Sequence, residues 1–188
     1  DYIYGGQFYL APRVYFHRMA AYLRYAYANN VRHYYAEASP SADWHEGPKL
    51  YVALKLLWNP AADVDQLLDD WYTAAVGPKA APFLAQYFRL WAEFWTGPLL
   101  ETNWFIRNGK RQYLDFGSGA YLDAFTKTDL TTCEQLLARA VQEAPEGLQR
   151  ERAQYIHDTL SRRLVELRSL VRLRNPVDVT MVGSVVKS

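Results

Sequence analysis

Apolar positions in residues 12–30 recur at intervals of three and four, which predicts an amphipathic helix. Pro12 suits the first turn of this helix, and Asn29 with Asn30 interrupts its pattern. Short runs of aromatic and β-branched residues stand on either side of it, at 2–4 and 31–36. Both runs are predicted to be strands, because this composition next to turn residues is typical of β-structure.

A nearly all-apolar run at residues 48–58 predicts the next helix, and a helix without a polar face is normally buried. Asp63 is a good N-cap for a third helix, which Gly77 and Pro78 end. Residues 83–95 carry aromatic side chains at helical spacing, so we expect them to pack in a core.

The remaining chain predicts two more helices after an irregular stretch at 97–118. Thr128 or Asp129 begins a helix that runs to Ala144, and a long final helix follows Gly147. The element order is therefore strand, helix, strand, helix and then about four helices.

This order predicts a mainly α fold with a minor parallel β component. Two strands cannot form a stable parallel sheet alone, so residues 1–58 are expected to be the last two β/α units of a larger α/β domain. Residues 59–175 would form a helical subdomain, and 176–188 a tail or the start of a further element.

Composition narrows the function classes. The 188 residues carry a formal net charge of +1, which argues against a general nucleic-acid binder. One cysteine, Cys133, excludes a disulfide scaffold and a cysteine-based metal site, and the histidines show no metal-ligand spacing. No apolar run approaches the roughly 18 residues of a membrane span. We expect neither a metal nor a cofactor.

Candidate chemistry follows from the predicted strands, because β/α enzymes place functional groups at strand ends and in the following loops. This rule selects Tyr4, Tyr35, Glu37, Trp44 and His45. Aromatic rings pack on the apolar faces of sugars, and carboxylates bind hydroxyls or exchange protons with the glycosidic oxygen. Glu37 is the candidate catalytic residue, and the other four are candidates for substrate binding.

Each of these residues also has an ordinary structural interpretation. Tyr34 and Tyr35 alternate sides of the predicted strand, so one of them is expected in the core. Trp44 is either a loop anchor or a sugar platform, and His45 is either a solvated or capping residue or a ligand contact.

One segment resembles a known family. Its most specific parts are Leu56-Leu57-Trp58-Asn59-Pro60 and Asp63-Val64-Asp65, followed by Trp71-Tyr72 and Gly77. In these motifs the chain is similar to an uncharacterised bacterial family of glycoside-hydrolase-like proteins related to α-glucuronidases and β-hexosaminidases. The likeness covers most of residues 1–173, although Val76-Gly77 replaces the family's Tyr-Gly.

The resemblance implies the end of a (β/α)8 barrel followed by a helical C-terminal region. It implies a bacterial, carbohydrate-active parent whose substrate is a polysaccharide or a uronic-acid-containing oligosaccharide. The start at Asp1 suggests a piece of a longer protein, with the rest of the parent chain as a partner. Glu37 would then contact substrate without donating the proton, and the piece alone would be inactive. Secretion or a periplasmic location would follow if the parent acts on polysaccharide.

The alternative is a non-enzymatic helical protein-interaction module. Residues 146–174 contain seven arginines and four acidic residues, so one face of the last helix could dock a partner. This hypothesis predicts a large exposed apolar patch and no concave polar site.

Overall fold

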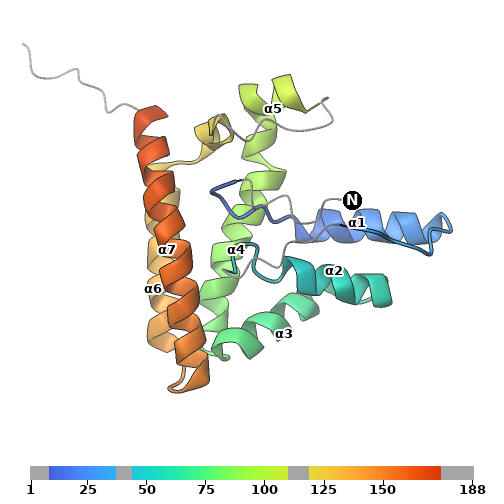
Figure 1. Cartoon of the computed structure of the whole chain (residues 1–188), viewed down its shortest axis with the longest axis horizontal. Helices are drawn as coiled ribbons and strands as arrows, with labels where there is room; N and C mark the ends of the chain where they lie inside the picture. Colours follow the sequence, from blue (N-terminus) through green and yellow to red (C-terminus); the bar gives the residue numbers. More distant parts are fainter. Residues whose placement is uncertain (1–8, 37–43, 110–118, 175–188) are drawn as a thin grey trace, which may run out of the picture.

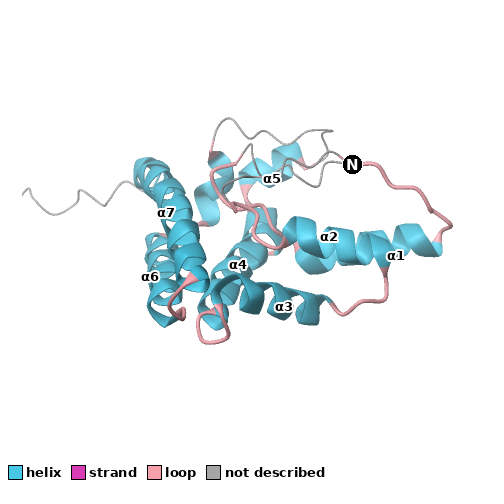
Figure 2. Cartoon of the chain, turned by 60° about the horizontal axis from the view of Figure 1, so that its bottom comes forward, coloured by secondary structure: helices cyan, strands magenta, loops and turns pink. Residues whose placement is uncertain are grey.

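A computed structural model describes residues 9–36, 44–109 and 119–174 (Figure 1). These residues form seven α-helices and two short 3-10 helices, and none of them belongs to a strand (Figure 2). The predicted β component, its β/α units and the barrel end are therefore wrong for this part of the chain. The proposed boundaries at residues 58 and 175 stay predictions.

Residues 31–36, predicted to be a strand, are irregular. Val31, Arg32 and His33 are exposed, so the run does not bury the face that a strand would place against a core. Local composition favours a strand only where a neighbour supplies hydrogen bonds and packing. The first predicted strand, residues 2–4, lies outside the described residues.

The first two helices are α1 (Phe16–Ala28) and α2 (Lys49–Trp58). Each buries one face, through Met19 and Leu23 in α1 and through Val52 and Leu56 in α2. The expectation that α2 is buried on most sides is wrong, because its outer face is open to solvent.

Two helices after α2 build most of the centre of the molecule. In α3 (Val64–Val76) the Asp63 side chain accepts hydrogen bonds from the first turn, as predicted, and Gly77 ends the helix at φ 89°. The next helix, α4 (Ala81–Thr96), has aromatic side chains on its buried face. It passes between the α1–α3 group and the C-terminal helices (Figure 1).

The stretch expected to be irregular, 97–118, contains two short helical segments, η2 (Pro98–Glu101) and α5 (Asn103–Asn108), and a third, η3 (Ala120–Ala124), follows it. After them come α6 (Lys127–Glu143) and α7 (Leu148–Arg174), which pack as an antiparallel pair (Figure 1). Thr126 caps α6 and exchanges hydrogen bonds with Asp129 in a capping box, so this helix begins slightly before the predicted cap.

The core is aromatic around α4. Trp91 stacks on Phe125 with ring centroids 4.3 Å apart, and Trp95 stacks on Tyr121 at 5.7 Å. The indole N–H of Trp95 donates to the carbonyl oxygen of Pro12 at 2.6 Å, which joins α4 to the chain before α1. The prediction that the aromatic residues of 83–95 pack in a core is confirmed for the buried ones.

Candidate binding cleft between α1, α3 and α4

The structure scatters the residues that the sequence selected. Tyr4 and Glu37 lie outside the described residues. Tyr35 is 81% exposed, while its neighbour Tyr34 is half-buried with its hydroxyl bonded to that of Tyr22. Tyr34 thus packs partly against the core and Tyr35 does not, but the run forms no strand, so strand alternation does not account for the difference.

Trp44 and His45 are packed into the protein. Trp44 is half-buried against Trp71, with ring centroids 5.4 Å apart, at a backbone φ of 58°. His45 is 1% exposed, and its Nε2 donates to the carbonyl oxygen of Tyr9 at 3.1 Å. These contacts support the role of loop anchor for Trp44 and a packing role for His45.

A buried ion pair lies directly after these residues. The Lys49 ammonium, 1% exposed, donates to the Glu46 carboxylate at 2.7 Å and lies 4.9 Å from the centre of the Tyr15 ring. Burial lowers the pKa of Lys49 to about 8, although the Glu46 charge opposes this change. Burial also raises the pKa of Tyr15. The group is closed to solvent and joins α1 to α2, so we assign it a structural role.

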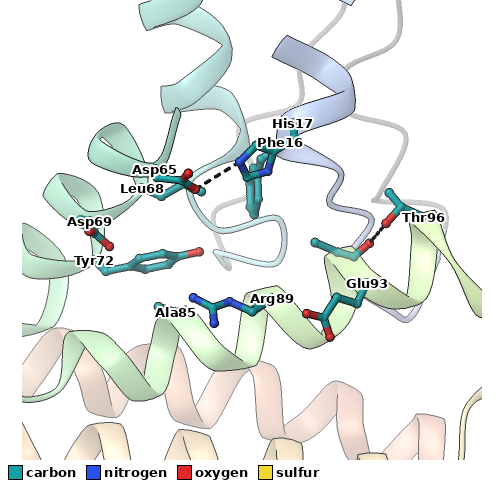
Figure 3. A pocket seen from close by; sticks show the side chains of 11 residues that line it. Phe16, His17, Asp65, Leu68, Asp69, Tyr72, Ala85, Arg89, Glu93 and Thr96 are labelled. Carbon is teal, nitrogen blue, oxygen red and sulfur yellow. Dashed lines mark hydrogen bonds and ion pairs between the residues drawn. The ribbon is translucent and has the colours of Figure 1, made fainter. Parts of the chain in front are cut away.

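An open cleft lies elsewhere, where α1, α3 and α4 meet (Figure 3). Its volume is about 420 Å³, within the range of about 300–1,000 Å³ that small-molecule sites occupy. Phe16 contributes an aromatic wall from α1, and Leu68 lies on α3. The polar side chains at the cleft come from all three helices: His17, Asp65, Asp69, Tyr72, Arg89, Glu93 and Thr96.

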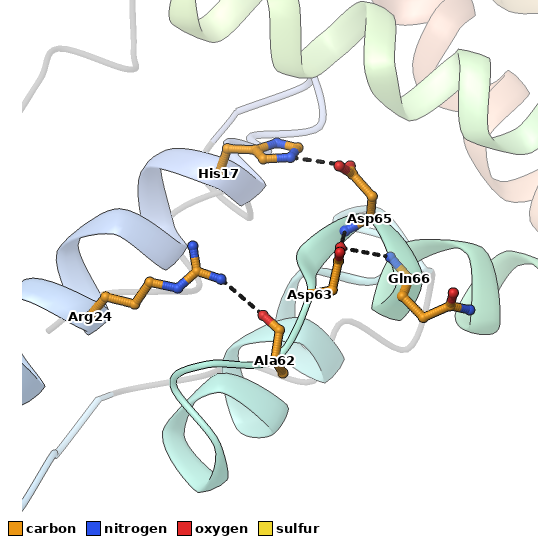
Figure 4. A network of polar contacts seen from close by, with 6 residues as sticks. All are labelled: His17, Arg24, Ala62, Asp63, Asp65 and Gln66. Atoms are coloured by element: carbon orange, nitrogen blue, oxygen red, sulfur yellow. Dashed lines mark hydrogen bonds and ion pairs between the residues drawn. The ribbon is translucent and has the colours of Figure 1, made fainter.

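One side of the cleft is held by contacts between α1 and α3. The His17 Nε2 lies 3.1 Å from an Asp65 carboxylate oxygen, and both side chains are mostly exposed (Figure 4). Arg24, two turns along α1, donates to the carbonyl oxygens of Pro60 and Ala62 just before α3. These contacts set the distance between the two walls.

Tyr72 is the most informative residue of the cleft. Its side chain comes from α3 and is 3% exposed, but its hydroxyl points into the cleft (Figure 3). Burial raises its pKa, and the Arg89 guanidinium opposes this effect. Among the described residues, the hydroxyl has no hydrogen-bond partner. Because the hydroxyl faces the open cleft, a ligand or water there can bind it.

Arg89 and two carboxylates complete the polar lining. Arg89 and Glu93 stand one turn apart on α4, and Asp69 faces them from α3 (Figure 3). None of these three side chains forms an ion pair with a described residue. The cleft therefore combines a guanidinium, an imidazole, a phenol and carboxylates, which can donate to and accept from a ligand rich in hydroxyl groups. No group of three or more His, Cys, Asp or Glu residues in the described ranges could hold a metal ion.

Sequence reasoning missed these residues because their local patterns have simpler explanations. Asp65 and Asp69 lie near the start of a predicted helix, where acidic side chains are favourable on electrostatic grounds alone, and Asp63 caps that helix. Tyr72 and Arg89 sit within helices whose packing partners cannot be known from spacing alone. The only signal in the sequence was that Tyr72 and Arg89 each lie at the edge of a predicted apolar helix face.

In its described part, the protein is an all-helical domain with a polar cleft between three helices. The family model described as a domain of unknown function, DUF4838, matches residues 2–89. The chain therefore carries a DUF4838 domain over this range, which includes α1, α2, α3 and the first half of α4 as far as Arg89. No curated protein and no solved structure matches the chain. Among the described residues, no helix is long and apolar enough to span a membrane.

Proposed function

We propose that the chain belongs to a carbohydrate-active, glycoside-hydrolase-like protein and that it binds a saccharide in the α1–α3–α4 cleft. The observation that carries this proposal is the Tyr72 hydroxyl, which is aimed into the cleft without a partner. Phe16 and Tyr72 lie at the floor of the cleft and are 4% and 3% exposed, so the ionic side chains around them supply most of the contacts, as hydrogen bonds to the sugar hydroxyls.

Arg89 suits a uronic acid in particular. Its guanidinium is unpaired within the described structure and lies beside the Tyr72 hydroxyl. A guanidinium can bind the carboxylate of a uronic acid through two parallel hydrogen bonds. The carboxylates of Asp69 and Glu93 would then accept hydrogen bonds from the sugar hydroxyls.

We expect binding without hydrolysis. Glycosidases need one carboxylic acid that is kept protonated by an enclosed environment and a second carboxylate on the opposite side of the bond. The three carboxylates of the cleft, on Asp65, Asp69 and Glu93, are all exposed. Glu37 stays the candidate catalytic residue proposed from the sequence.

Calorimetric titration with neutral oligosaccharides and with oligomers of glucuronate or galacturonate tests this proposal. Tyr72→Phe should weaken saccharide binding by about 2- to 10-fold, the effect of one hydrogen bond. The matched control is Tyr155→Phe, an exposed tyrosine on α7, which should leave binding unchanged. Arg89→Met should weaken binding of uronate oligomers more than binding of neutral ones. If no saccharide binds, or if Tyr72→Phe binds as well as the original protein, the proposal is wrong.

The alternative of a docking face on the last helix has less support. Arg150 donates to the carbonyl oxygen of Ala144, and Arg168 pairs with Glu134 on α6. These arginines thus hold α7 to the rest of the molecule. The last helix does expose Leu148, Tyr155 and Val165, but the most exposed apolar side chain of the described residues, Trp58, lies on α2.

A further inference from the structure

The C-terminal ends of α1 and α2 lie side by side and project away from the α6–α7 pair (Figures 1 and 2). Arg24 joins them, because it donates to the carbonyl oxygen of Pro60 at 2.8 Å and to that of Ala62 at 2.9 Å. We call the exposed side chains at this end the tip. It consists of Tyr25, Arg32, Leu54, Lys55, Leu57 and Trp58.

The tip exposes large apolar side chains to an unusual degree. Trp58 is 92% exposed, Tyr25 71% and Leu54 59%. Leu54, Leu57 and Trp58 are three and four residues apart, so they share one side of α2, opposite the face that Leu56 buries. Single exposed apolar residues are normal, but a contiguous group indicates an interaction surface.

The exposed charged side chains of the tip itself are cationic, and the carboxylates of Asp63 and Asp65 follow at the start of α3. Neither α1 nor α2 contains an acidic residue. In the described residues 9–36 and 44–58 the only carboxylate side chain is that of Glu46, which is paired with the buried Lys49. The same ranges contain six Lys and Arg: Arg13, Arg18, Arg24, Arg32, Lys49 and Lys55. The exposed cations of the tip, Arg32 and Lys55, therefore favour an anionic partner.

We propose that the tip docks onto the surface of an anionic phospholipid bilayer. Its shape supports this partner, because a projecting end reaches a flat surface that a recessed one would not. Leu54 and Leu57 suit the acyl boundary, and Trp58 suits the interfacial region where indole rings gather. Lys55 is exposed and placed to pair with anionic headgroups, and Arg32 adds positive charge to the tip although its guanidinium also donates to the carbonyl oxygen of Tyr27. Exposed leucines have no comparable use in contacting a saccharide, which needs flat rings and hydrogen bonds.

Vesicle co-sedimentation tests the proposal. The whole chain should bind vesicles of equal parts phosphatidylcholine and phosphatidylserine and should bind vesicles of phosphatidylcholine alone much more weakly. Lys55→Gln should lower binding about fivefold, the effect of one cation near the surface. Trp58→Ser should lower it further. These residues are exposed, so neither change should unfold the protein, and circular dichroism verifies that.

Matched control variants lie on the far helices. Lys127→Gln removes an exposed cation at the start of α6, and Val165→Ser removes a side chain of α7 that is 63% exposed. Both should leave vesicle binding unchanged. Equal binding to the two vesicle types, or equal losses in the tip and control variants, would overturn the proposal. Self-association that Trp58→Ser abolishes, in a chain that ignores both vesicles, would show a protein partner instead and would also overturn it.

Discussion

Burial of Lys49 should make the contribution of this residue to protein stability rise with pH in the alkaline range. Burial lowers the pKa of Lys49 from its ordinary 10.5 to about 8. The unfolded chain therefore binds more protons than the folded one between these two values. Because stability rises with pH wherever the unfolded state binds more protons, the contribution of Lys49 to the free energy of unfolding should increase above pH 8. Burial raises the pKa of Cys133 and of tyrosines such as Tyr72 and Tyr87, and these groups act in the opposite direction.

The expected size follows from the proton difference. One proton corresponds to about 1.4 kcal/mol for each pH unit, so the contribution of Lys49 to the free energy of unfolding should rise by about 2 kcal/mol between pH 8 and about pH 9.5. Urea denaturation at several pH values in this range measures it. Lys49→Met should abolish this part of the rise, because the titrating group is gone.

The difference in pH dependence between the original protein and the Lys49→Met variant isolates the contribution of Lys49. Burial raises the pKa of the Cys133 thiol, which lowers stability as pH rises, but this effect is present in both proteins and cancels. Lys55→Met is the matched control, since Lys55 is exposed on the same helix, and it should leave the slope unchanged. An identical pH dependence in the original protein and in Lys49→Met would refute the assignment.

Three further predictions concern stability and reactivity. Thr126→Ala removes the cap of α6 and should lower the free energy of unfolding by about 1 kcal/mol, whereas Thr131→Ala inside α6 should cost less; thermal denaturation compares them. Gly77→Ala should lower the free energy of unfolding by more than about 1 kcal/mol, because φ is 89° and the new Cβ would lie 2.7 Å from Pro145. Gly147→Ala is the control: φ is 94°, but its Cβ meets no atom within 4 Å, so it introduces backbone strain alone. Urea midpoints that rank the two variants in the reverse order would contradict this reasoning. Cys133 should resist iodoacetamide in the folded protein and react after denaturation, because it is buried and burial raises its pKa; mass spectrometry that finds rapid alkylation of the native protein would contradict its burial.

The helices were predictable where the apolar period was long and the ends carried capping residues. Asp63 and Gly77 mark the two ends of α3 both in the sequence and in the structure. Large apolar residues at helical spacing, such as Leu160 and Leu164, mark the buried face of α7. The run at 31–36 was not predictable, because Val31 and the tyrosines favour a strand locally and only tertiary contacts decide whether one forms.

The chemistry of the candidate site was predictable in kind but not in position. The sequence predicts a site with carboxylates, an imidazole and aromatic rings in one loop region. The structure brings those groups together from three helices, with His17 in place of His45 and Asp69 with Glu93 as described carboxylates. Which faces of α1, α3 and α4 turn toward one another depends on the packing of the whole core, and spacing within one helix carries no information on that.

The two proposed surfaces should respond differently to salt, because charge is divided unevenly along the chain. Residues 59–101 contain six acidic and two basic residues and include the α3 and α4 walls of the cleft, whereas the tip belongs to the basic end. Vesicle binding would rely on attraction between a net positive surface and an anionic one, which is screened within about 10 Å at 0.1 M salt. A neutral saccharide in the cleft would be bound by short hydrogen bonds, which salt affects little. Raising the salt concentration should therefore release the protein from vesicles while neutral saccharide binding persists. Loss of both activities at the same salt concentration would indicate one shared, charge-driven surface.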